Sequence, residues 1–145
     1  IMPKLDSYSF HCGIIDCFCE MVAAGLKPLA LSEPLPSKED CEEYLPFVEE
    51  CAKKHRISFY LELDSLVTDL FPFEKNKNKS HFLFYRDPQV LARYKEIRQE
   101  KERYLTANTY DKDARFAIAS AFGALLGYPS DGINRLIAQN ERPEP

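Results

Sequence analysis

Residues 57–63 read ISFYLEL, and the side chains alternate between two sets along the whole stretch. One set is uniformly apolar: Ile57, Phe59, Leu61 and Leu63. A period of two predicts a β-strand, because successive side chains of a strand point to opposite faces. This strand decides the fold class, since a helical pattern precedes it and a further strand pattern follows.

The helical pattern before it covers residues 37–55. Ser37 can cap the first turn, and Glu39 and Asp40 favour the positive end of the helix dipole. Pro46 lies inside the pattern, which predicts a kink or a division into two helices. The face expected to be buried combines apolar, thiol and imidazole side chains at helical spacing: Cys41, Tyr44, Leu45, Val48, Cys51, Ala52 and His55.

Two further strands are expected, at residues 26–31 and at the HFLFY stretch of residues 81–85. The order strand, helix, strand predicts a right-handed crossover with the first two strands parallel, and the third strand pairs back as a hairpin. The stretch EKNKNKS at residues 74–80 is expected to be a polar, mobile connection.

The remaining elements are helices. They are expected near residues 12–24, ended by Gly25; after Asp87 and Pro88; at residues 114–126; and at residues 131–139. The third of these is apolar nearly all round, which predicts a central position in a helical bundle. The sequence therefore predicts one mixed α/β domain spanning residues 1–145, with a small three- to four-stranded sheet, flanking helices and a helical C-terminal half.

The composition supports a folded, soluble class. The 145 residues are 45% hydrophobic and 29% charged, with a net charge of −4, which excludes disordered and collagen-like chains. No apolar run reaches about 18 residues, so no membrane span is expected. No secretory signal is recognised, and the five cysteines form an odd set without a CxxC motif. Reduced thiols in the cytoplasm are the expectation.

The cysteines near the N-terminus are candidates for metal ligands and for a catalytic nucleophile. Cys12 and Cys19 would share a helical stripe, but two turns separate them by about 10.5 Å, too far for zinc–sulfur bonds of about 2.3 Å. Cys17 points away from both. Cys12 beside His11 at a helix N-terminus could be a nucleophile, although no accompanying motif supports it. Structural thiols without a bound metal are expected.

The charge is unevenly distributed along the chain. Residues 74–103 hold nine Lys/Arg and five Asp/Glu, a net of +4, whereas the remainder carries −8. This asymmetry predicts an anionic ligand or an acidic protein partner at residues 74–103, the alternative being two solvated faces of opposite sign. The overall acidity argues against nucleic acid. A flat interaction patch could also join two copies across a two-fold axis, as a homo-oligomer.

Carboxylates follow two of the expected strands. Glu62 and Asp64 end the second strand, Asp69 lies in the next segment and Arg86 ends the third strand. If these strand ends converged, the four side chains would surround a pocket for a divalent ion or a phosphate. The alternative reading makes Glu62 part of a solvent-facing edge and Asp64 a turn residue.

Arg115 interrupts the apolar helix of residues 114–126. A buried arginine needs a carboxylate or an anionic ligand, and Asp111 or Asp113 could neutralise it. It could also reach solvent from the first turn.

Familiar catalytic and nucleotide-binding signatures are absent from the sequence, and no cofactor is indicated. The first functional hypothesis is therefore a binding or interaction module without catalysis. The second is a small hydrolase or phosphate-handling enzyme built on Glu62, Asp69 and Arg86, with or without a divalent metal. A concave pocket joining those three side chains would distinguish the enzyme from the module.

Overall fold

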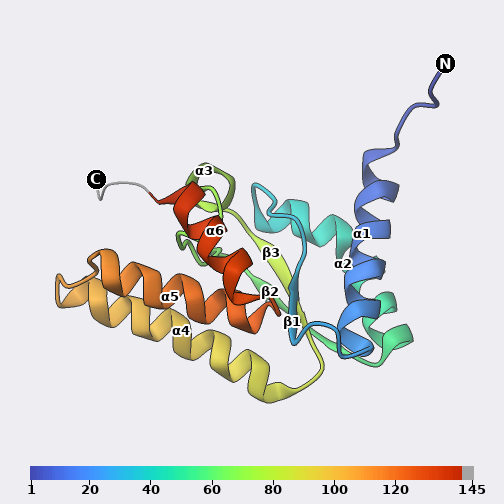
Figure 1. Cartoon of the computed structure of the whole chain (residues 1–145). Coiled ribbons are helices and arrows are strands. Elements are labelled where there is room, and N and C mark those ends of the chain that lie inside the picture. The colour runs from blue at the N-terminus through green and yellow to red at the C-terminus, as the bar shows by residue number, and fades with distance from the viewer. Residues whose placement is uncertain (142–145) are drawn as a thin grey trace.

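The computed structural model of the chain describes residues 1–141, and its elements alternate between helix and strand before a helical second half (Figure 1). In chain order they are α1 (Ser7–Ala23), β1 (Leu29–Leu31), α2 (Lys38–His55), β2 (Ser58–Glu62), α3 (Phe73–Asn76), β3 (His81–Tyr85), α4 (Pro88–Thr106), α5 (Lys112–Leu125) and α6 (Ser130–Asn140). The predicted mixed α/β class with a small sheet and a helical C-terminal half is confirmed.

Local sequence signals placed several helix ends correctly, but α1 begins at Ser7 rather than near Cys12, so Cys12 does not lie at a helix N-terminus. The Ser37 hydroxyl accepts a hydrogen bond of 3.2 Å from the Asp40 amide, and the Asp87 carboxylate accepts one of 2.9 Å from the Gln89 amide. Gly25 follows α1 with a positive φ, as a helix-ending glycine does. Pro46 does not divide α2, which runs continuously from Lys38 to His55.

The strand pairing differs from the expected parallel crossover. The sheet order is β1-β3-β2, and both neighbouring pairs are antiparallel. β1 and β2 run in the same direction, but β3 lies between them. The sequence of β3 explains this position, because His81, Phe82, Leu83 and Phe84 are all buried and only the central strand is covered on both faces and both edges.

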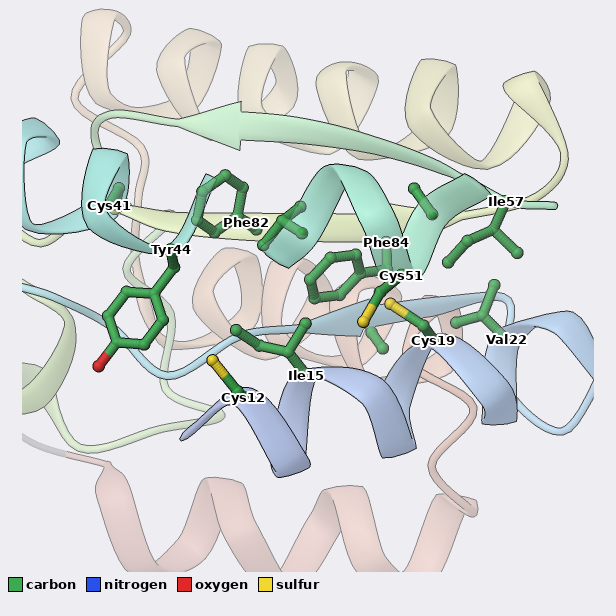
Figure 2. Packing of buried hydrophobic residues seen from close by; sticks show 13 residues of the cluster. Cys12, Ile15, Cys19, Val22, Cys41, Tyr44, Cys51, Ile57, Phe82 and Phe84 are labelled. Carbon is green, nitrogen blue, oxygen red and sulfur yellow. The ribbon is translucent and has the colours of Figure 1, made fainter. Parts of the chain in front are cut away.

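Helices cover both faces of the sheet, so the core has two parts. The first cluster joins α1 and α2 to Ala30, Phe82 and Phe84. Figure 2 shows its side chains, with the sulfur atoms of Cys19 and Cys51 pointing toward each other between the two helices. The second cluster joins α4, α5 and α6 to Leu29 and Leu83, on the opposite face. The alternation predicted for β2 is confirmed, since Phe59 and Leu61 pack on the first cluster and Tyr60 packs on the second.

Two expectations about the C-terminal half need correction. α5 lies between α4 and α6, as expected (Figure 1), but it is not buried all round, since Phe116 on its outer face is 47% exposed. The stretch of residues 74–80 is not a free connection, because it begins within α3, and Asn76 and Ser80 are buried. No helix in residues 1–141 is long and apolar enough to cross a membrane.

Candidate functional site

The expected carboxylate pocket separates into three places in the structure. At the end of β2, the Glu62 carboxylate is buried and accepts a hydrogen bond of 2.7 Å from the Tyr94 hydroxyl. Arg98 Nη1 lies 3.4 Å from the same carboxylate and donates a 2.7 Å bond to the Asp64 carbonyl. Glu62 is therefore not on a solvent-facing edge, as the alternative reading held. Through Tyr94 and Arg98, the Glu62 carboxylate links α4 to the sheet.

Asp69 and Arg115 form a separate buried pair. Arg115 Nε and Nη2 donate bonds of 3.0 and 2.9 Å to the two carboxylate oxygens of Asp69. Both side chains are about nine-tenths buried. This fork-to-fork geometry connects the segment after β2 to α5 across 46 residues of sequence. The expected partners of Arg115 do not hold it: Asp111 instead caps α5, accepting a 2.9 Å bond from the Ala114 amide.

Arg86 lies at the opposite end of the sheet. In the antiparallel register Glu62 pairs with His81 and Ser58 pairs with Tyr85, so Arg86 follows the far end of β3. Its guanidinium is exposed and donates a 2.9 Å bond to the Ala23 carbonyl at the end of α1. The convergence of Arg86 with Glu62, Asp64 and Asp69 is thus wrong, because it assumed that the strands end at one edge.

Part of the positive charge of residues 74–103 is engaged within the protein, on helix α4. On α4, Arg93 contacts Glu96 and Glu100, and Arg98 contacts Glu62. The Lys101 ammonium donates a 2.7 Å bond to the Val67 carbonyl. Helix α4 consequently offers an outside partner less positive charge than the sequence suggested.

A concave site exists elsewhere, around the end of edge strand β1. We call it the edge-strand groove; it holds about 440 Å³ of space open to water. Its wall combines residues from both core clusters with the segments that follow β1 and precede β3: Ile14, Phe18, Lys27, Leu31, Ser32, Glu33, Pro34, Phe71, Pro72, Lys75, Asn76, His81, Leu126 and Tyr128. Its volume is within the range of about 300–1,000 Å³ that is typical of small-molecule sites.

His81 is the most deeply buried polar group of this wall. It is 2% exposed, and neither ring nitrogen makes a hydrogen bond within the described part of the chain. Burial lowers the pKa of His81 to about 4, although Glu62 on the neighbouring strand and the Ser32 backbone favour the charged form. The imidazole is therefore neutral at pH 7, and its contact with the Ser32 backbone, which acts on the pKa, falls short of good hydrogen-bonding geometry.

Lys27 is the second polar group of the groove. Its ammonium lies 5.2 Å from the centroid of the Phe18 ring and 5.1 Å from that of Tyr128, so it sits between two aromatic side chains. Burial lowers the pKa of Lys27, and no carboxylate of residues 1–141 forms an ion pair with it. At the mouth, the exposed Glu33 carboxylate lies 2.7 Å from His11 Nδ1.

Sequence reasoning missed both groups. His81 was included only as the first letter of a strand, and Lys27 only as part of residues 26–31. A weak signal was present for each: a histidine in an otherwise aromatic, buried strand, and a lysine beside Pro28 between two apolar segments. Neither signal shows a groove, because the wall comes from segments up to about 110 residues apart.

The cysteines are free thiols, as the sequence predicts. Cys12, Cys19, Cys41 and Cys51 are buried and unpaired, and Cys17 is exposed. Burial raises the pKa of Cys19 to about 12 and that of Cys51 to about 11, which keeps both protonated and unreactive. Within residues 1–141 no group of three or more His, Cys, Asp or Glu side chains is arranged to hold a metal ion.

Comparison with known proteins adds no assignment: no family model, curated protein or solved structure matches the chain significantly. The chemistry of the groove is inferred from its own residues.

Proposed function

We propose that this domain is a binding module and that the edge-strand groove is its ligand site. The observation that carries the proposal is a buried imidazole without a hydrogen-bond partner, His81, beside a half-buried ammonium, Lys27, in the wall of a groove of about 440 Å³. A buried polar group without a partner is unfavourable by about 1–3 kcal/mol, so a ligand that supplies the partner gains that interaction.

Binding is better supported than catalysis. Ser32, His81 and Glu62 are neighbours around the groove, yet no hydrogen bond joins the Ser32 hydroxyl or the Glu62 carboxylate to the imidazole. The Ser32 Oγ accepts a 2.8 Å bond from the Phe82 amide, and Glu62 is bound by Tyr94. A nucleophile and its base need to be within hydrogen-bonding reach. The hydrolase alternative has less support, since Glu62, Asp69 and Arg86 lie in three different places.

The proposal also accommodates the charge asymmetry of the sequence. Lys75, in the positive segment of residues 74–103, lies at the rim of the groove and is exposed. The anionic ligand expected for that segment would then bind beside α3 rather than along α4.

The proposal is tested by filling the groove. Ile14, on α1, lines it and is half-buried, so Ile14→Trp should occupy part of the space without disturbing the opposite face of the helix. Cys17→Trp is the matched control, because Cys17 is exposed on the same helix and lies outside the groove. The probes are three naphthalenes with a negative, neutral or positive substituent: 2-naphthoate, 2-naphthamide and 2-(aminomethyl)naphthalene.

At least one probe should raise the melting temperature of the wild type and of Cys17→Trp, since a ligand that binds only the native state stabilises it. The increase should be absent in Ile14→Trp. Equal increases in all three proteins, or none with any probe, would refute the groove as the ligand site.

A further inference from the structure

The positively charged group inside the edge-strand groove is the Lys27 ammonium, which has no counter-ion among residues 1–141. Lys27 is half-buried between Phe18 and Tyr128, and burial is the cause that shifts its pKa, with no charged neighbour contributing. Ring faces attract a cation but do not neutralise it. A negative group on a ligand would complete this site, and the low local dielectric would strengthen that contact.

Beside Lys27 the wall favours a single negative charge, since the other lysine of the lining, Lys75, is exposed at the rim. The Glu33 carboxylate also lines the groove, and it would repel a second anionic oxygen even though it is paired with His11. Phosphate dianions are commonly bound by bidentate arginine, and the groove contains no arginine. The lining thus favours a carboxylate over a phosphate.

The aromatic side chains of the wall favour a ligand with a flat ring system. Phe71 and Tyr128 meet edge to face, with ring centroids 6.4 Å apart and an angle of 85° between the planes. Phe18 lies on the other side of Lys27. Ring bodies gain offset or edge-to-face contacts with such side chains beyond the simple burial of area.

We propose that the ligand class of the edge-strand groove is a monoanionic aromatic acid, whose carboxylate pairs with Lys27 and whose ring body lies along Phe18, Phe71 and Tyr128. This inference rests on the proposed function, because it names the ligand class of the same groove.

The experiment titrates ¹⁵N-labelled protein with 2-naphthoate and, separately, with 2-naphthamide, which has the same ring and no charge. The largest chemical-shift changes should come from amides that line the groove, such as those of Ser32 and His81. The acid should bind about tenfold more tightly than the amide or better, since hydrogen bonds to a charged group are the stronger ones. 2-Naphthyl phosphate, mostly a dianion at pH 7.5, should bind more weakly than 2-naphthoate.

The variant Lys27→Met keeps the length and the apolar stem of the side chain but removes its charge. It should bind the acid and the amide equally, whereas Lys53→Met, at an exposed position of α2, should keep the preference for the acid. Circular dichroism and the amide spectrum of the free variants show that both are folded.

The possible failures separate the two proposals. Equal binding of acid and amide in the groove of the wild type, tighter binding of the phosphate, or an unchanged preference in Lys27→Met would overturn the ligand class and leave the groove as a binding site. Shift changes elsewhere on the molecule, or no binding by any of the probes, would overturn both.

Discussion

The two layers that cover the sheet differ in their chemistry. The layer formed by α1 and α2 packs thiols and apolar side chains on Phe82 and Phe84, and every buried residue of its cluster is uncharged. The layer formed by α4, α5 and α6 has an apolar centre of similar size, but buried charges border it. They are the Asp69–Arg115 pair and the Glu62–Tyr94–Arg98 network, with His81 beside them.

The comparison shows two ways of attaching helices to one sheet. In the first layer, the buried contact depends on shape and on apolar area, so a core substitution should matter in proportion to the volume it removes. The charged contact between its helices lies at the edge of this core, where Asp16 of α1 is 2.7 Å from His55 Nε2 and 3.0 Å from Lys54 Nζ of α2. In the second layer, replacement of one polar side chain can leave its partner charged, buried and without a hydrogen bond. The second layer should therefore respond more strongly to single substitutions of buried polar groups.

The largest effect is expected for Arg115→Met. The change leaves the Asp69 carboxylate buried and without its two charge-assisted bonds, which typically lowers the free energy of unfolding by about 3–5 kcal/mol. Urea denaturation monitored by circular dichroism measures it.

The double variant Asp69→Leu/Arg115→Met is the control for this experiment. It removes both charges, so it should recover much of the lost stability. If the double variant is as unstable as Arg115→Met, lost packing rather than an uncompensated charge is responsible.

The next effect concerns pH and His81. In the folded protein burial holds the pKa of His81 near 4, below its usual value of about 6.5, so the unfolded chain takes up the proton first as the pH falls. The native state therefore loses stability between about pH 6.5 and pH 4, by about 3 kcal/mol for a shift of this size. His81→Leu removes this loss.

The measurement is the difference in unfolding free energy between His81→Leu and the wild type at pH 7, 5.5 and 4. It should move in favour of the variant as the pH falls. A constant difference across the three values would mean that His81 titrates in the folded protein as it does in water.

A smaller effect tests which face of α5 belongs to the second layer. A methyl group added at Gly123 would lie 2.7 Å from Ile133 Cγ1 on α6, so Gly123→Ala should lower the free energy of unfolding by about 1–3 kcal/mol. Ala121 is half-buried, so Ala121→Leu should have less effect than Gly123→Ala. A helix that is apolar nearly all round, as the sequence suggests for residues 114–126, would make Ala121→Leu severe as well, and urea midpoints decide between the two expectations.

The smallest effect is expected in the first layer. Ile15 is 4% exposed and lies among apolar and thiol side chains, so Ile15→Val should lower the free energy of unfolding by about 0.5–1.5 kcal/mol. The decrease should be the same at pH 5 and pH 7, because no titrating group adjoins the methyl group that is removed. A decrease that depends on pH would erase the contrast between the layers.

What could be predicted from the sequence was local. Ser37 and Asp87 were recognised as caps because a cap and its helix are a few residues apart. The alternation of residues 57–63 was sufficient to assign the two faces of β2. These features depend on spacing, and spacing is visible in a single chain.

What could not be predicted depends on which distant segments meet. Nothing near Arg115 indicates that its carboxylate is Asp69 rather than Asp111, because a charge does not reveal its partner. The candidate site failed for the same reason: Arg86 was placed with Glu62 through an assumed strand order. Lys27 became notable only once Phe18 and Tyr128, 110 residues apart, were seen on either side of it.

The central place of β3 has a consequence for how the chain folds as it is made. β1 and β2 bond to β3 and not to each other, so no sheet can form until residues 81–85 have been synthesised. At about 5–20 residues per second, the ribosome needs roughly 1–4 s to pass from the end of β2 to the start of β3. During that interval the apolar segments of β1 and β2 have no partner strand. A fragment that stops before His81 would leave the edges of both strands free to pair with other chains.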